Sequence, residues 1–183
     1  MNYNKVSIYC NRWELVVNTR KTKIMIFKKS GRLPNNTVFN FDNVEIEIVK
    51  NFTYLGIVFS TGGSFSEAQS VLSGQALKAI FQMNEYLHRF LFVQHRLDLF
   101  EKLITPILNY GSQVWGFAQG TCIERVHLQF CKRLLGVKKC TQNDFVYGEL
   151  GRMNCQYVRY FIIIRCWVKI LHVNDNKYDK KRG

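Results

Sequence analysis

Residues 64–90 read SFSEAQSVLSGQALKAIFQMNEYLHRF, and this stretch decides the fold of the chain. Its apolar residues recur every three or four positions, which places them on one face of a helix. They are Ala68, Leu72, Ala76, Ala79, Ile80, Met83, Leu87 and Phe90. Ser64 and Glu67, three positions apart, match the pattern of a capping box at a helix start. We therefore predict a long helix that begins just after Gly63.

On the N-terminal side of Gly62-Gly63 the apolar pattern has a period of two. The run Val44-Glu45-Ile46-Glu47-Ile48 alternates strictly, so one face of a strand is apolar and the other is acidic. A hairpin turn is expected at Asp42-Asn43, between strands at 38–41 and 44–49. Further strands are expected at 23–27 and 52–59, and residues 1–13 read as the end of a helix.

On the C-terminal side the period stays close to 3.6 residues. A helix is expected from Leu97 to Leu108, kinked or divided at Pro106. The next, from Thr121, has Glu124 at capping-box spacing and Gly136 as its C-cap. A short helix over 141–150 should stop at Gly151, and Asn154 could cap a last helix to about Val173. The tail, residues 174–183, is expected to be frayed.

These patterns predict an α+β protein, with a short antiparallel β segment followed by an α-helical lobe. The expected divisions are 1–62, 63–173 and the tail 174–183. The 183 residues include 26 Lys and Arg against 13 Asp and Glu, a formal charge of +13, and 47% are hydrophobic. This composition excludes disorder and favours a polyanionic partner, either nucleic acid or an anionic membrane surface. The most apolar stretch, 160–173, is too short to span a membrane and contains Arg165 and Lys169.

The residue chemistry indicates no self-sufficient active site. The acidic residues are scattered, the four histidines share no ligand spacing, and the six cysteines form no CxxC pair, so we predict no metal site. Free thiols and the lack of a signal peptide favour an intracellular protein, in the cytoplasm or the nucleus, that is not secreted.

Two clusters of cations stand out. One runs from Arg20-Lys21-Lys23 to Lys28-Lys29, and the other comprises Arg125, Lys132, Arg133, Lys138 and Lys139. The second lies on a predicted helix whose other face is apolar, so its cations can contact phosphates, although a merely solvated helix face is the alternative. Tyr54, Tyr110 and Trp115 are candidates for stacking on bases, with core packing as the alternative.

Several strings, in order, resemble reverse transcriptases of LINE-type (non-LTR) retrotransposons. Residues 10–18 and 21–27, CNRWELVVN and KTKIMIF, resemble the segment after the catalytic aspartate hairpin. Residues 52–59, FTYLGIVF, resemble the primer-grip strand pair. Residues 99–116, with ITPILNYGSQVWG, resemble the thumb, and 123–137, 147–152 and 167–169 continue the match.

The resemblance implies a C-terminal palm and thumb piece of an RNA-directed DNA polymerase. Lys21, with Lys23 as competitor, would assist release of pyrophosphate, and Tyr54-Leu55-Gly56 would position the primer end. The helical cations Arg125, Lys132, Arg133, Lys138 and Lys139 would hold the template–primer duplex by its backbone. The implied partners are RNA, an RNA–DNA hybrid or DNA, with no membrane; the oligomeric state stays open.

The two metal-binding aspartate motifs of that family lie upstream of the matched segment. We therefore expect Mg²⁺ only in a full-length family enzyme, no cofactor in this chain, and no polymerisation by this chain alone. Two alternatives are a non-catalytic basic module that binds RNA or DNA, and an inactive remnant.

Overall fold

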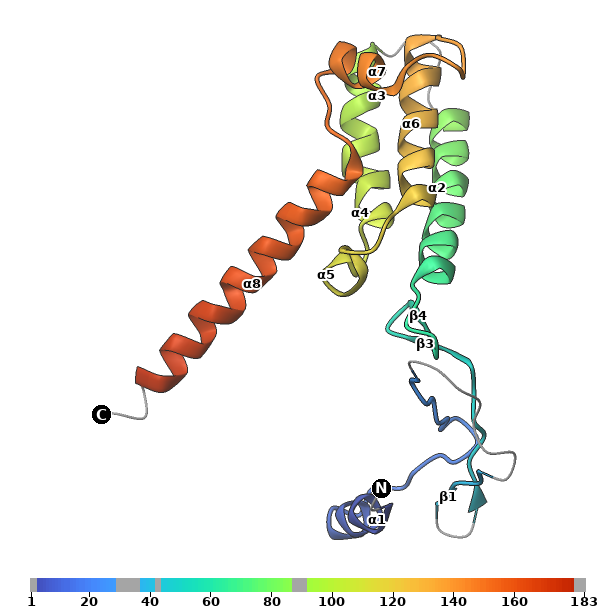
Figure 1. Cartoon of the computed structure of the whole chain (residues 1–183), viewed down its shortest axis with the longest axis vertical. Coiled ribbons are helices and arrows are strands. Elements are labelled where there is room, and N and C mark those ends of the chain that lie inside the picture. The colour runs from blue at the N-terminus through green and yellow to red at the C-terminus, as the bar shows by residue number, and fades with distance from the viewer. Residues whose placement is uncertain (1–2, 29–36, 42–43, 87–91, 180–183) are drawn as a thin grey trace. The chain divides into compact units, whose positions relative to one another are not determined.

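The computed structural model describes residues 3–28, 37–41, 44–86 and 92–179, which divide into two compact units, Met1–Phe65 and Ser66–Gly183 (Figure 1). All described strands lie in the first unit, and all described helices except one lie in the second, which confirms the α+β class. Some predictions fall outside the described residues: those at Lys29, the Asp42-Asn43 turn, Leu87, His88, Phe90 and the tail beyond residue 179.

The first unit begins with the predicted N-terminal helix, α1 (Tyr3–Arg12). Two short antiparallel pairs follow, β1 (Asn40–Phe41) with β2 (Val44–Glu45), and β3 (Asn51–Tyr54) with β4 (Ile57–Ser60). The alternation after residue 44 is confirmed at its centre, where Ile46 is buried while Glu45 and Glu47 are exposed.

Two strand predictions in this unit are wrong. Residues 23–27 form no strand; within this run only Ile24 pairs, in an isolated parallel bridge with Ile48. The expected single strand over 52–59 is instead the β3–β4 hairpin, which reverses at Leu55-Gly56 with φ of 47° and 78°. Positive φ at both central residues defines the turn that matches the twist of a two-residue hairpin, and Gly56 adopts it without strain.

The second unit is helical. Its elements are α2 (Ser66–Tyr86), α3 (Val93–Leu99), the π-helical turn η1 (Phe100–Ile104), α4 (Thr105–Leu108), α5 (Ser112–Trp115), α6 (Thr121–Leu135), α7 (Asn143–Leu150) and α8 (Cys155–Asp179). The predicted stripe on α2 is buried at Ala68, Leu72, Ala76, Ile80 and Met83. Helix α2 packs against both α4 and α6, so the stripe contributes to the core of the unit (Figure 1).

The predicted interruption at Pro106 takes the form of a π-helical turn. Pro106 lies in the first turn of α4, which follows η1 without a break, and proline has no N–H to donate to the preceding turn. In the preceding η1 the backbone N–H of Thr105 donates to the carbonyl of Phe100, five residues back. The wider turn relieves the clash that a proline ring makes with the carbonyl four residues before it.

Stacked rings form the centre of the helical unit. The ring centroids of Phe100 and Phe130 lie 4.1 Å apart, and the imidazole of His127 lies 5.5 Å from the ring of Phe100. Tyr147 also stacks on His127, with the ring centroids 5.5 Å apart. This stack joins η1, α6 and α7.

The predicted helix ends are confirmed where they depend on local backbone geometry. Gly136 and Gly151 adopt left-handed φ of 67° and 60° after α6 and α7. The Oδ1 atom of Asn154 accepts the N–H groups of Gln156 at 3.1 Å and Tyr157 at 3.3 Å, as a cap of α8 does.

Three other predictions about helix ends are corrected. No side chain caps the start of α6, so the capping box at Thr121 and Glu124 is wrong. Helix α2 begins at Ser66, two residues later than expected from a start just after Gly63. Helix α8 runs to Asp179, six residues past Val173, so residues 174–179 of the expected frayed tail are helical.

Candidate functional site

Helix α6 separates its apolar and cationic residues onto two faces, as its sequence predicts. Ile123, Val126, His127, Phe130 and Cys131 are buried on the inner face. Arg125, Gln129, Lys132 and Arg133 recur at helical spacing on the other side, together with Leu128. Because packing fixes the inner face, the position of the cations on the outer face is also fixed.

The outer face of α6 lines a surface cavity of about 310 Å³. The left-handed turn at Gly136 folds the following residues back along the helix, and the backbone N–H of Val137 donates to the carbonyl of Lys132 at 3.1 Å. The Nζ atom of Lys132 donates to the carbonyl of Lys139 at 2.8 Å, which closes the loop. The lining residues are Arg125, Leu128, Gln129, Lys132, Arg133, Val137 and Lys139; we call this site the α6 cavity.

The α6 cavity is positive in its electrostatics. It contains four of the five predicted helical cations; Lys138 is exposed but does not line it. No acidic residue is among its lining residues. The described carboxylates form no ion pair with any of these four cations; the Lys23–Glu47 and Arg152–Glu101 pairs lie outside the cavity. Such an arrangement can bind an anion such as phosphate.

In the first unit, Tyr54-Leu55-Gly56 lies at the tip of the β3–β4 hairpin. Tyr54 is 59% exposed and Leu55 is 72% exposed, although both are large and apolar in part. Leu55 adopts a positive φ, which is unfavourable for a residue with a branched side chain. The strained tip therefore presents an aromatic ring and an aliphatic side chain to the surroundings.

The two lysines proposed to act on pyrophosphate differ in their partners. Lys23 forms an ion pair with Glu47. Lys21 is exposed, and its backbone N–H donates to the carbonyl of Asn18 at 3.1 Å and to Asn18 Oδ1 at 3.2 Å. Of the two, Lys21 has the ammonium without an ion-pair partner in the described part of the chain.

The aromatic residues considered for stacking on bases also differ. Tyr110 is 50% exposed and stays a candidate. Trp115 is 1% exposed, and its indole N–H donates to the carbonyl of Tyr110 at 2.9 Å, so its candidacy for base stacking is wrong. The guanidinium carbon of Arg159 lies 5.6 Å from the centroid of the Trp115 ring, which makes the tryptophan part of the core.

The sequence does not predict a polar cluster that forms between α6, α7 and α8. The Glu124 carboxylate accepts the hydroxyl proton of Tyr147 and, at 2.9 Å, the backbone N–H of Cys155. Burial, followed by the hydrogen bond to Glu124, raises the pKa of Tyr147. Burial also raises the pKa of Cys155 to about 12 and that of Cys131 to about 12, so both thiols are protonated at neutral pH. No local pattern marks this cluster, because its partners lie on different helices.

His127 lies at the edge of a second cavity of about 460 Å³, bordered by η1, the loop after α7 and the start of α8. Burial, followed by the nearby Arg152 guanidinium, lowers the pKa of His127 to about 4. The imidazole is therefore neutral at pH 7. The cavity also contains the Arg152–Glu101 ion pair, and its lining is otherwise largely apolar.

Among the described residues, no group of three His, Cys, Asp or Glu side chains comes together as a metal site would require. None of the helices in the described part of the chain has the length and apolar content needed to cross a membrane.

The chain is 21% identical over 137 residues to the probable RNA-directed DNA polymerase from transposon BS of Drosophila melanogaster. The aligned stretch covers 74% of this chain and 15% of that relative, so the chain spans only a small part of the polymerase's length. No family model matches the chain. No solved structure matches it either. The chain is thus similar to part of a transposon RNA-directed DNA polymerase.

Proposed function

We propose that the chain is the part of a LINE-type reverse transcriptase that binds the template–primer duplex. The observation that carries the proposal is the α6 cavity, where four cations surround one surface hollow that no acidic residue lines. The similarity to a transposon RNA-directed DNA polymerase supports a nucleic acid as the anion that these cations meet.

The chemistry of the cavity suits a phosphate backbone more than base edges. Arginine and lysine neutralise phosphates and release condensed counterions whatever the sequence, so binding is strong at low salt and indifferent to bases. The guanidinium groups of Arg125 and Arg133 can each form two parallel hydrogen bonds to one phosphate. An RNA–DNA hybrid is the expected ligand, with RNA and DNA as the other members of the class.

Within the same proposal, the β3–β4 tip positions the end of a primer. Its exposed Tyr54 ring can stack on a terminal base or sugar, and Gly56 lets a backbone approach closely. Lys21 is assigned the pyrophosphate side, because its ammonium has no described ion-pair partner, whereas that of Lys23 is engaged by Glu47.

The test is the salt dependence of binding to a short RNA–DNA hybrid. The logarithm of the association constant should fall linearly with the logarithm of the salt concentration, with a slope of about −0.9 per neutralised phosphate. The double variant Arg125→Gln, Arg133→Gln should bind more weakly at low salt, and the magnitude of its slope should be smaller by about 2. The matched control is Lys102→Gln with Lys169→Gln, which removes two exposed charges outside the cavity and should leave the slope nearly unchanged.

Two outcomes favour other functions. A chain that does not bind the hybrid at low salt is the inactive remnant. A chain that binds double-stranded DNA, RNA and the hybrid equally well, but gains nothing from a recessed primer end, is a general nucleic-acid-binding module. Primer extension on primed RNA with dNTPs and Mg²⁺, above a control without protein, would contradict the expectation that this chain alone does not polymerise.

A further inference from the structure

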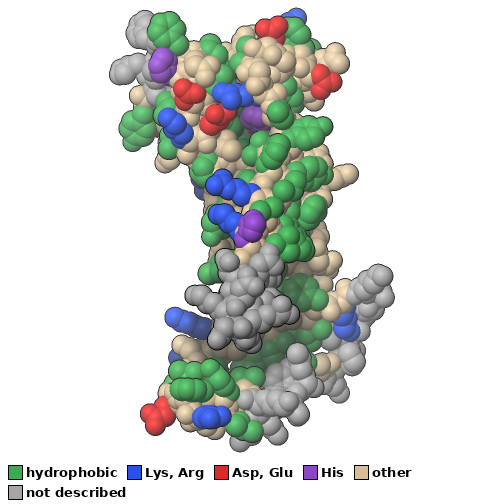
Figure 2. Space-filling model, turned by 90° about the vertical axis from the view of Figure 1, so that its left-hand side faces the viewer, with side chains coloured by type: hydrophobic (Ala, Val, Ile, Leu, Met, Phe, Trp, Pro, Cys, Tyr) green, Lys and Arg blue, Asp and Glu red, His purple; other side chains and the backbone are tan. Residues whose placement is uncertain are grey.

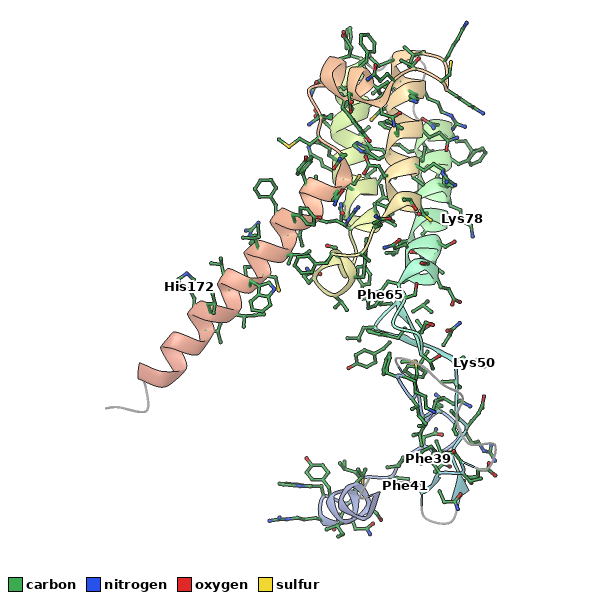
Figure 3. The ribbon with its side chains drawn as sticks, viewed as in Figure 1. Phe39, Phe41, Lys50, Phe65, Lys78 and His172 are labelled. Carbon is green, nitrogen blue, oxygen red and sulfur yellow. The ribbon has the colours of Figure 1, made fainter. Side chains whose placement is uncertain are left out.

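Helix α8 has a buried side and, opposite it, an exposed apolar side. On one side Cys155, Arg159 and Ile163 are buried, where the start of the helix packs against α5 and α6. Beyond Ile163 the helix projects from the bundle of its own unit, and side chains extend from it on all sides near the labelled His172 (Figures 1 and 3). Between Ile164 and Val173 the projecting part has many exposed apolar side chains, unlike a helix that is solvated on all sides.

The other side of α8 has a continuous exposed stripe, spaced four, three, four and three residues apart. It consists of Tyr157, Phe161, Ile164, Val168 and Leu171, whose exposed fractions run from 45% to 67%. This spacing is the a/d repeat of a two-stranded coiled coil, and we call the stripe the α8 seam. Figure 2 faces the side from which α8 projects and shows hydrophobic side chains gathered beside isolated Lys, Arg and His.

We propose that the α8 seam pairs with the α8 seam of a second copy of this chain, as a parallel and in-register helix pair. Phe161 borders the second cavity of its own unit, but the seam as a whole faces away from the buried side of α8, so the helical unit of each copy lies on the outside of the pair. A two-fold axis parallel to the helices makes the two surfaces identical, as in most homodimers.

The residues that flank the seam favour the parallel direction. In a parallel pair, the ring of Tyr160 in one copy faces Arg165 of the other, and Trp167 faces His172. Each contact places a cation or an imidazole over an aromatic ring, which is attractive. An antiparallel pair centred on the seam would instead bring the two Arg165 side chains together, and like charges at that distance repel.

The surface available is large enough for a stable pair. Burying the five seam side chains removes about 500 Å² of apolar surface per copy, and the flanking rings bring the total near the ~800 Å² per partner of a standard interface. The intramolecular contacts of α8 hold its first turns in place, so part of the ordering cost of a coiled coil is already met.

The experiment measures the mass of the full chain by sedimentation or light scattering up to ~100 µM. The unchanged chain should show twice the 21.6 kDa of one copy. Ile164→Glu, in the seam, should raise the dimer dissociation constant at least ~100-fold. Ile170→Glu is the matched control, since it changes the same residue type at 50% exposure outside the seam, and it should remain dimeric. Circular dichroism checks that both variants are helical.

Direction is tested by cross-linking in a Cys140→Ser background. Leu171→Cys should form a disulfide between copies on mild oxidation, because only the parallel register brings the two positions together. Val173→Cys, 64% exposed but outside the seam, should not. The proposal is overturned by a chain that is monomeric at ~100 µM, by equal dissociation of Ile164→Glu and Ile170→Glu, or by cross-linking at 173 rather than 171. It does not depend on nucleic-acid binding.

Discussion

Replacing Glu124 by alanine should destabilise the helical unit more than the loss of one surface charge can explain. The carboxylate of Glu124 holds three helices together, since it belongs to α6, accepts the hydroxyl of Tyr147 on α7, and accepts the first N–H of α8 at Cys155. Alanine removes the acceptor from both donors. Neither donor has another hydrogen-bond partner in the described structure to which it can turn.

The magnitude follows from the two lost bonds. A hydrogen bond to a charged group contributes about 1.5–3 kcal/mol, and a stranded buried donor costs about 1–3 kcal/mol. Water reaches the half-buried carboxylate and recovers part of this cost, so we expect Glu124→Ala to lower the free energy of unfolding by about 2–4 kcal/mol. Glu124→Gln keeps one oxygen for the Cys155 N–H and can donate to the Tyr147 hydroxyl, so its loss should be about 1 kcal/mol.

The assay is urea unfolding of the full chain, followed by circular dichroism and by tryptophan fluorescence, to which the buried Trp115 contributes. Glu149→Ala removes an exposed carboxylate from α7 and should change the free energy by less than about 0.5 kcal/mol. If Glu124→Ala unfolds at the same urea concentration as Glu149→Ala, the carboxylate does not join the three helices as argued.

Three further predictions concern the effect of pH through His127, the replacement of glycines by alanine, and the turn residue Leu55. Burial lowers the pKa of His127 to about 4 from its ordinary 6.5, so between these pH values the unfolded chain binds a proton that the folded chain does not. The free energy of unfolding, measured with urea, should therefore fall by about 3 kcal/mol as the pH is lowered from 6.5 towards 4. His127→Phe should make the free energy of unfolding less dependent on pH in this range. Gly120→Ala places a Cβ 2.7 Å from the buried guanidinium of Arg159 and should cost about 1–3 kcal/mol, whereas Gly148→Ala, with nothing within 4 Å, should gain up to ~1 kcal/mol in thermal denaturation. Leu55→Asn relieves the positive φ and should raise hydrogen-exchange protection in β3 and β4 by about 1 kcal/mol, while weakening any contact of the tip with a primer end.

The elements that the sequence predicts correctly depend on neighbours within one or two turns of the chain. The α6 stripe and the left-handed ends at Gly136 and Gly151 are of this kind, because residues three or four positions apart decide them. The capping box at Thr121 and Glu124 has equally good local spacing, yet it does not form. Glu124 is instead bonded to residues 23 and 31 positions away, and no local pattern contains those distances.

The residues of the candidate site also fall into those that local spacing predicts and those that it does not. The spacing of Arg125, Lys132 and Arg133 on one helix predicts that they share a face. Lys139 lines the cavity with them, but Lys138 does not. This difference is set by the path of the chain after Gly136, which residue types alone do not specify. Trp115 is the reverse case: an aromatic residue in a basic chain suggests base stacking, but this tryptophan is buried beside Tyr110 and Arg159.

The cations of the α6 cavity are not equivalent, because the side chain of Lys132 also makes a hydrogen bond that holds the backbone in place. The ammonium of Lys132 donates to the carbonyl of Lys139 and so holds the turn that carries another cation. Lys132→Gln removes a charge and also releases the turn, so it should displace Lys139 and weaken hybrid binding more than Arg133→Gln does, although each removes one positive charge. The slope of the logarithm of the association constant against the logarithm of the salt concentration reports the number of displaced counterions. Its magnitude should decrease by about 2 for Lys132→Gln and by about 1 for Arg133→Gln. Equal slopes for the two variants would mean that Lys139 contacts phosphate without the help of Lys132.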